Sequence, residues 1–77
     1  MRKIQILGTG CPKCKTLLAN AEQAVRESGV AASIEKVEKI QDILAFGVML
    51  TPALALDGEV KAAGKILTVA EIKRLLA

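Results

Sequence analysis

The sequence contains no histidine, and this absence excludes several classes of catalytic site. A Ser-His-Asp triad, a Cys-His pair, a HExxH metal site and a Cys/His zinc finger all need histidine from the same chain. Any chemistry must therefore depend on the cysteines, the carboxylates, the lysines or the backbone. No pair of carboxylates has a spacing that singles out acid and base roles.

Aromatic residues are almost absent as well, since Phe46 is the only one in 77 residues. No row of rings exists on which nucleic-acid bases could stack. The formal net charge is only +3, and the basic residues are scattered from Arg2 to Arg74 without a block that would bind phosphates. Nucleic acid is therefore not expected as a partner, and Phe46 is expected to lie in the core.

Long hydrophobic runs are also missing. The longest apolar tract extends from Ile43 to Leu56, is broken by Gly47, Thr51 and Pro52, and is shorter than the roughly 20 residues of a membrane span. We expect this tract to be core and expect no membrane partner. No stretch of signal-peptide length follows Met1, which predicts a cytoplasmic protein.

What the sequence does contain is a globular mixture, with 52% hydrophobic and 25% charged residues. A chain of 77 residues is near the lower limit for one core, which predicts one domain over residues 1–77. A monomer is expected. Both cysteines fall in the stretch Cys11-Pro12-Lys13-Cys14. They cannot form a framework that ties distant segments together, so a structural staple explains the pair poorly.

The periodicity and turn residues predict seven elements in the order βαβαββα. The strands are expected at 3–7, 30–37, 53–56 and 59–62, and the helices at 12–28, 38–46 and 68–76. Asp57-Gly58 is typical of a two-residue hairpin turn, and Thr68 with Glu71 fits a capping box. The strand, helix, strand opening implies a parallel crossover. The fold class is therefore α/β, with a four-stranded mixed sheet and three helices.

The cysteine pair is the strongest chemical signal. Residues three apart lie on one face of a helix, so the sulfurs of Cys11 and Cys14 can approach bonding distance. Cys11 is expected at the helix start, where unpaired N–H groups, Lys13 and Lys15 favour a thiolate. A thiolate attacks disulfides, and a second thiol one turn later can release the partner in reduced form. This predicts Cys11 as the nucleophile and Cys14 as the resolving cysteine.

Other readings of the pair stay open at this point. Two thiolates after a first strand also describe a copper-type metallochaperone, and two chains could share one zinc ion. A metallochaperone, however, has a hairpin directly after its first helix and a strand at its C-terminus, whereas this sequence predicts a second helix before the hairpin and a helix at the end. A structural adaptor without redox activity is a third reading. The oxidoreductase hypothesis itself requires no cofactor or metal.

Taken together, the element order, Thr9-Gly10-Cys11-Pro12-Lys13-Cys14 and Thr51-Pro52-Ala53-Leu54 resemble the thioredoxin fold. The short length is most similar to glutaredoxin and to the small thioredoxin-like redox-active disulfide proteins. The resemblance covers nearly the whole chain. It implies a thiol-disulfide oxidoreductase whose partners are disulfide-containing proteins and an electron donor, either a reductase or glutathione.

The resemblance also implies roles for individual residues. Pro52 corresponds to the cis-proline that faces the cysteine pair, and Thr51 would offer its backbone to an extended substrate. Gly64 matches part of the glycine pair with which glutaredoxins hold glutathione, although their acidic residue is missing here. With Pro12 and Lys13 between the cysteines, these residues form the predicted substrate-binding set.

Overall fold

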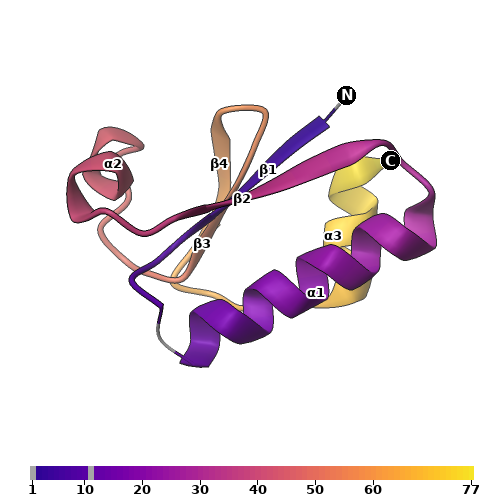
Figure 1. The fold of residues 1–77 in the computed structure, drawn as a ribbon, viewed down its shortest axis with the longest axis horizontal. Helices are drawn as coiled ribbons and strands as arrows, with labels where there is room; N and C mark the ends of the chain where they lie inside the picture. The colour runs from indigo at the N-terminus through magenta and orange to yellow at the C-terminus, as the bar shows by residue number, and fades with distance from the viewer. Residues whose placement is uncertain (1, 11) are drawn as a thin grey trace.

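The chain folds into one sheet flanked by helices, as the computed structural model shows for residues 2–10 and 12–77 (Figure 1). The elements, in chain order, are β1 (Arg2–Leu7), α1 (Pro12–Ser28), β2 (Ala32–Val37), α2 (Ile40–Ala45), β3 (Ala53–Leu56), β4 (Glu59–Ala63) and α3 (Val69–Leu76). This order is the predicted one. The predicted class, α/β with a four-stranded mixed sheet and three helices, is confirmed for the described residues.

The sheet has the strand order β2-β1-β3-β4. β1 pairs in parallel with β2, because α1 crosses over between them, and antiparallel with β3. β3 and β4 form the predicted antiparallel hairpin, with a register shift between Leu54 and Ala55 that the sequence did not indicate. The end of β1 therefore lies between the ends of two other strands, and the chain leaves this edge of the sheet toward α1.

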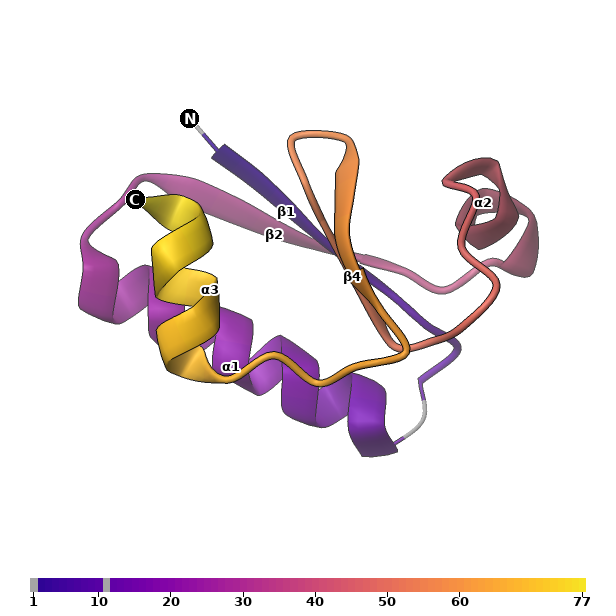
Figure 2. The same ribbon diagram turned by 180° about the vertical axis from the view of Figure 1, so that it is seen from behind.

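The two faces of the sheet bury separate apolar clusters. Ile4 and Ile6 of β1 alternate onto the face covered by α1 and α3, where Leu17 and Ile72 are almost fully buried. Figure 2 shows α3 lying beside α1 on this side of the sheet, and their cluster is the larger of the two. Leu7 points to the opposite face, where α2 and its flanking loop supply the cover that residues 2–10 and 12–77 provide.

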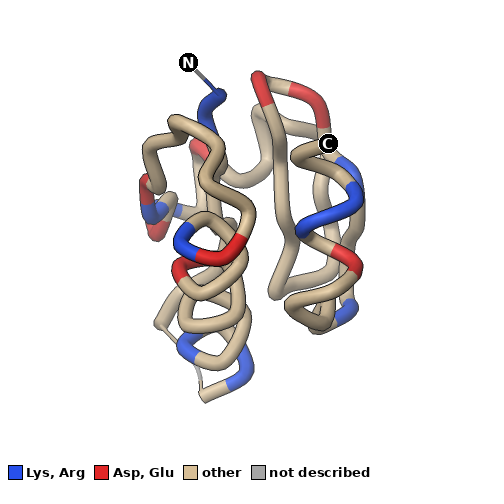
Figure 3. The backbone as a smooth tube through the Cα atoms, turned by 90° about the vertical axis from the view of Figure 1, so that its right-hand side faces the viewer, with Lys and Arg blue, Asp and Glu red and all other residues tan. Residues whose placement is uncertain are grey.

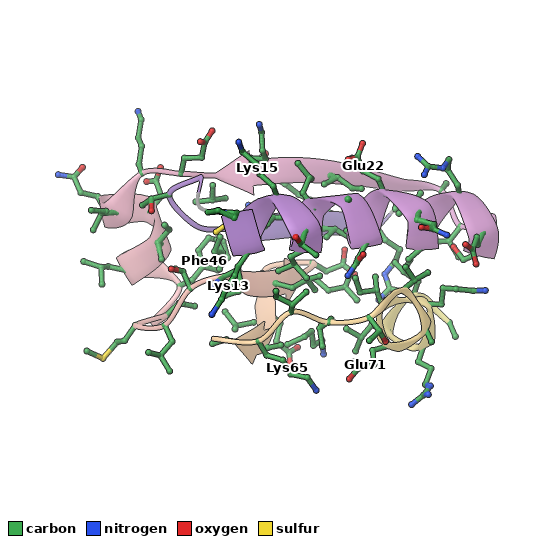
Figure 4. All side chains as sticks on the ribbon, turned by 90° about the horizontal axis from the view of Figure 1, so that it is seen from below. Lys13, Lys15, Glu22, Phe46, Lys65 and Glu71 are labelled. Atoms are coloured by element: carbon green, nitrogen blue, oxygen red, sulfur yellow. The ribbon has the colours of Figure 1, made fainter. Side chains whose placement is uncertain are left out.

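The hairpin turn and the start of the last helix each have the local geometry that their residues predict. Asp57 and Gly58 both have positive φ, 53° and 85°, as the predicted two-residue turn requires. At the start of α3 the Thr68 hydroxyl accepts from the Glu71 N–H at 3.2 Å, and the Glu71 carboxylate accepts from the Thr68 N–H at 3.1 Å. The capping box is confirmed, and Lys65 adds an ion pair of 3.0 Å to Glu71 (Figure 4).

The prediction for the apolar tract from Ile43 to Leu56 is wrong in its middle. Ile43 and the β3 residues are buried, but Leu44, Met49 and Leu50 are exposed. α2 is a helix of only 6 residues that covers the sheet with one face, so its other face and the loop residues Met49 and Leu50 remain in solvent. β2 and α2 also begin two residues later than the sequence predicted, at Ala32 and Ile40.

Charged residues of both signs occur along α1 and α3 (Figure 3). Lys73 of α3 reaches Glu27 of α1 at 3.3 Å, which links the two helices at their exposed edge. None of the helices in the described ranges is long and apolar enough to span a bilayer.

The Asp57 side chain ties the hairpin turn to the start of β1. Its carboxylate accepts from the Lys3 backbone N–H at 2.9 Å and from Arg2 Nε at 2.7 Å. These bonds, the Lys3 bond above all, lower the pKa of Asp57 below its usual value. A lowered folded-state pKa stabilises the protein above the unfolded pKa, and this stability is lost as the pH falls through the folded value.

We therefore expect Asp57→Asn to reduce the acid sensitivity of the fold. The difference in the free energy of unfolding between about pH 7 and about pH 3, measured with urea, should be smaller in the variant. Part of the loss should remain, because hydrogen bonds also lower the pKa values of Glu27 and Glu71. An unchanged difference would show that Asp57 does not contribute to the pH dependence.

Candidate functional site

The predicted redox pair lies where β1 passes into α1. Cys11, the predicted nucleophile, is outside the described residues. Pro12 is the first residue of α1, as the sequence predicted, and its missing N–H costs nothing because the first N–H groups of a helix have no partner in the helix. No acidic residue lies in the first turn of α1 itself, and the negative charge near it is the Glu38 carboxylate, 3.6 Å from the Cβ position of Gly10.

Pro12 and Lys13 are both exposed at this end of the helix. Lys13 and Lys15 extend to opposite sides of the first turns of α1 (Figure 4). Two lysines therefore add positive charge on either side of the helix start. This charge favours an anionic sulfur or an anionic partner at the N-terminus of α1.

Cys14 is the third residue of α1 and is only 6% exposed. Its side chain faces Gly8, just after β1. A Cβ atom built on Gly8 would lie 3.3 Å from Cys14 Cβ and would overlap Cys14 Sγ. The φ angle of Gly8 is not in the left-handed region, so glycine is needed here for space and not for backbone conformation. Gly8 is what allows the Cys14 thiol to approach the sheet.

The loop before β3, which contains Thr51 and Pro52, also belongs to the site. The Thr51–Pro52 peptide bond is cis, as the resemblance implied, and Pro52 is buried while Thr51 is exposed. Thr51 Cβ lies 3.9 Å from the Cβ position of Gly8, on which Cys14 also packs. Cys14 and Thr51 thus flank the same glycine, although 37 positions of sequence separate them (51 minus 14).

Gly64 supports this loop from the end of β4. Its N–H donates to the Pro52 carbonyl at 2.9 Å, and its φ of 71° suits glycine. The Leu50 side chain lies directly against it, with Cβ 3.1 Å from where a Gly64 side chain would begin. The predicted residues Cys14, Thr51, Pro52 and Gly64 therefore lie in one region, and their roles in substrate binding stay predictions.

A cavity of about 360 Å³ opens beside Cys14. Gly8, Thr9 and Gly10 form one wall, and Lys15, Lys36 and Glu38 contribute the charged side chains of its lining. The lining thus gives the cavity two positive charges and one negative charge. Its position makes Cys14 reachable from one side although the residue is largely buried.

Sequence reasoning missed several residues of this region. Gly8 was read only as a turn glycine, and neither Glu38 nor Lys36 was singled out. The one available signal was the pair of glycines in Gly8-Thr9-Gly10, which is more than a simple turn requires. The contact of Gly8 with Cys14 depends on how α1 packs back along the sheet. A pattern of neighbouring residues in the sequence carries no information on that packing.

Metal ligation was the alternative use of the cysteine pair. Within residues 2–10 and 12–77, no three His, Cys, Asp or Glu side chains are grouped in a way that could hold a metal ion. Cys14 itself belongs to the buried lining between α1 and Gly8. Nothing in the described site favours a metal over thiol chemistry.

Comparison with known proteins agrees with the fold. Residues 2–77 match the thioredoxin domain family. A thioredoxin of Methanothermobacter thermautotrophicus is 46% identical over 77 residues and is covered over its full length, as is this chain. A thioredoxin of Methanocaldococcus jannaschii is 44% identical over 73 residues, which cover 95% of this chain and 84% of that protein. The chain belongs to the thioredoxin domain family.

Proposed function

We propose that this member of the thioredoxin family reduces disulfides of other proteins with the Cys11–Cys14 dithiol. The observation that carries the proposal is the position of Cys14, which lies at the start of α1 against Gly8 and next to Thr51 of the cis-proline loop. Family membership and two relatives named thioredoxin support thiol-disulfide exchange in general. Neither comparison supports the metal carrier.

The proposed reaction has two exchange steps. The Cys11 thiolate attacks one sulfur of the substrate disulfide, the S–S bond breaks, and the other sulfur leaves as a thiolate that takes up a proton. Cys14, after losing its own proton, attacks Cys11 in the mixed disulfide and releases the second substrate thiol. The substrate gains two electrons, and the protein is left with a Cys11–Cys14 disulfide.

The surroundings of α1 support Cys11 as the nucleophile and Cys14 as the resolving cysteine. The positive end of the α1 dipole and two lysines lie at this place, and the first turn of α1 holds no acidic residue, which together favour a thiolate one position before Pro12. The Glu38 carboxylate, 3.6 Å from the Cβ position of Gly10, is the opposing negative charge nearby. Cys14 is buried, so it is poorly placed to meet a bulky disulfide first. Its position three residues after Cys11 in the sequence is the spacing that would allow it to attack the mixed disulfide.

The electron donor that fits the proposal best is a protein reductase. The resemblance to glutaredoxin would require glycine and acidic groups that hold glutathione after β4. In this region the Gly64 N–H already donates to Pro52, and Leu50 lies against Gly64. The residues that follow, Lys65, Ile66 and Leu67, include no acid, and the nearby Glu71 carboxylate already accepts from Lys65 and the Thr68 N–H. We therefore propose thioredoxin reductase as the donor class over glutathione.

A coupled reduction assay tests the function and the donor together. With insulin as substrate, the protein should catalyse reduction when thioredoxin reductase and NADPH are supplied, and much less when glutathione and glutathione reductase replace them. In the reduced protein, Cys11 should be alkylated with a pH midpoint below the value of about 8.5 for an ordinary thiol. Failure to reduce insulin or a small disulfide with any donor, or with dithiothreitol, would refute the exchange function.

A further inference from the structure

The cavity of about 360 Å³ beside Cys14 has charged side chains of both signs in its lining. Lys15 comes from α1, Lys36 from the end of β2, and Glu38 from the segment that follows β2. We call this space the charged cavity. It lies on the flank of the redox site that α1 and β2 form, on the side of α1 to which Lys15 extends (Figure 4). The described residues of the cis-proline loop do not line it.

The three charged side chains of the charged cavity are available to a ligand. Lys15, Lys36 and Glu38 are all exposed, and none of them forms an ion pair or a side-chain hydrogen bond within residues 2–10 and 12–77. Four other lysines of the chain do pair with carboxylates. Charges of both signs therefore line one cavity without neutralising each other.

The Glu38 carboxylate lies over the loop between β1 and α1. Its Oε2 atom is 3.6 Å from the Cβ position of Gly10, the residue that precedes Cys11 in the sequence. At the other end of this loop, Gly8 contacts the Cys14 side chain, which lines the same cavity. A small ligand with its charged end near Glu38 would therefore have its remaining atoms close to the redox site.

We propose that the charged cavity binds the amino-acid end of a small disulfide of the cystine class, in which one carbon carries both an ammonium and a carboxylate group. Lys15 and Lys36 hold the carboxylate, and Glu38 holds the ammonium, through charged hydrogen bonds. The inference rests on the proposed exchange function and adds small zwitterionic disulfides to its substrates. Small-molecule sites have volumes of about 300–1,000 Å³, and the charged cavity lies at the lower end of this range.

Reduction of cystine needs no reactant beyond the dithiol. The Cys11 thiolate attacks one sulfur of cystine, the S–S bond breaks, and one cysteine leaves as a thiolate that takes up a proton. Cys14 then loses its proton, attacks the sulfur of Cys11 and releases the second cysteine. Cystine gains two electrons and becomes two cysteine molecules, while the dithiol is oxidised to the Cys11–Cys14 disulfide.

Other ligands match the mixed charge of the lining less well. An acidic segment of a protein would bring carboxylates toward Glu38 as well as toward the lysines, and a purely cationic ligand would meet Lys15 and Lys36. Glutathione disulfide has the same amino-acid group, but several more bonds separate this group from the sulfur. In the charged cavity the three charges and Cys14 line one small space.

The test uses four disulfides whose halves are similar in size and differ in charge. They are cystine, dithiodipropionate, cystamine and hydroxyethyl disulfide, which end in a zwitterion, a carboxylate, an ammonium and a neutral hydroxyl. Each rate with the reduced protein is divided by the rate with dithiothreitol, which corrects for the different leaving thiols. Cystine should then react about tenfold faster than hydroxyethyl disulfide, as expected for one or two exposed charged hydrogen bonds. Cystamine should show no such gain.

Two variants separate the contributions of the lysines and the carboxylate. In Lys15→Gln/Lys36→Gln the corrected rate for cystine should fall to about that for hydroxyethyl disulfide. In Glu38→Gln the rate for cystine should fall, while the rate for dithiodipropionate should rise because the carboxylate that repels it is gone. A general change in thiol reactivity cannot produce these opposite effects, since it would change the rate for hydroxyethyl disulfide as well.

Lys39→Gln is the matched control. Lys39 is exposed and follows Glu38 directly, but it does not line the charged cavity, so the preference for cystine should persist. All the replaced side chains are exposed, and the fold should tolerate their loss. Equal corrected rates for the four disulfides in the wild type would overturn the inference, while reaction with hydroxyethyl disulfide would still support the exchange function.

Three further outcomes would also overturn the assignment. A preference for cystine that survives both variants, or that Lys39→Gln lowers equally, would assign it to charges outside the cavity. A loss of insulin reduction in Lys15→Gln/Lys36→Gln with unchanged cystine reduction would assign the charged cavity to an acidic protein segment. A wild-type protein that reacts with none of the disulfides would remove the exchange function on which the inference rests.

Discussion

Replacing Cys14 by serine is expected to leave the protein joined covalently to its substrates through Cys11. The first exchange needs only the Cys11 thiolate, whereas release of the mixed disulfide needs a second thiol. Serine is slightly smaller than cysteine, so it fits beside Gly8, but it has no nucleophilic sulfur. Turnover in the insulin assay should fall to the uncatalysed level, and mixed disulfides should accumulate as larger species on non-reducing gels.

Cys11→Ser provides the control, because it leaves Cys14 in place but removes the proposed nucleophile. This variant should form no mixed disulfide and should show no turnover, and mass spectrometry of the trapped Cys14→Ser complexes should find the linkage on Cys11. Trapping by Cys11→Ser instead would reverse the assigned roles. If neither variant trapped a partner, the mechanism of two successive exchanges would be wrong.

The elements and their order could be predicted because their signals are local. The Asp57-Gly58 turn, the Thr68 capping box and the helix over residues 12–28 each depend on residues within a few positions of one another. The parallel pairing of β1 with β2 then follows from the handedness of the crossover. The largest errors in the predicted bounds are two residues, at the starts of β2 and α2, and the bounds of β1, β4 and α3 and the end of α2 differ by one. β2 begins late because Ala31 and Ala32 have little preference for a strand.

The site could be predicted only in part, because several of its contacts join distant segments. The cysteine motif and Thr51-Pro52 are visible in the sequence, but nothing local shows that Gly8 makes room for Cys14. Composition also misled the prediction for Leu44 and Met49. Both residues were predicted to lie in the core because they are apolar. Whether an apolar residue is buried depends on which element covers it, and no described element covers this side of α2.

Gly8→Ala is expected to damage both the fold and the resolving step. The added methyl would overlap Cys14 Sγ, so the thiol must rotate away or the start of α1 must move from the sheet. Overpacking of a buried site costs about 1–3 kcal/mol in the free energy of unfolding, which urea titration can measure. A displaced Cys14 should also attack the mixed disulfide more slowly, which a stopped-flow release experiment can follow.

The control variant must lower the free energy of unfolding without changing the surroundings of the cysteines. Gly29 has a φ of 71° and no atom within 4 Å of its Cβ position, so Gly29→Ala strains the end of α1 far from its start. It should cost about 1–2 kcal/mol through the left-handed backbone alone. If Gly29→Ala retained normal release while Gly8→Ala slowed it, the position of the Cys14 thiol would be the cause. Equal slowing in both would attribute the effect to lost stability, and unchanged release in Gly8→Ala would show that the close approach of Cys14 to Gly8 is not needed for resolution.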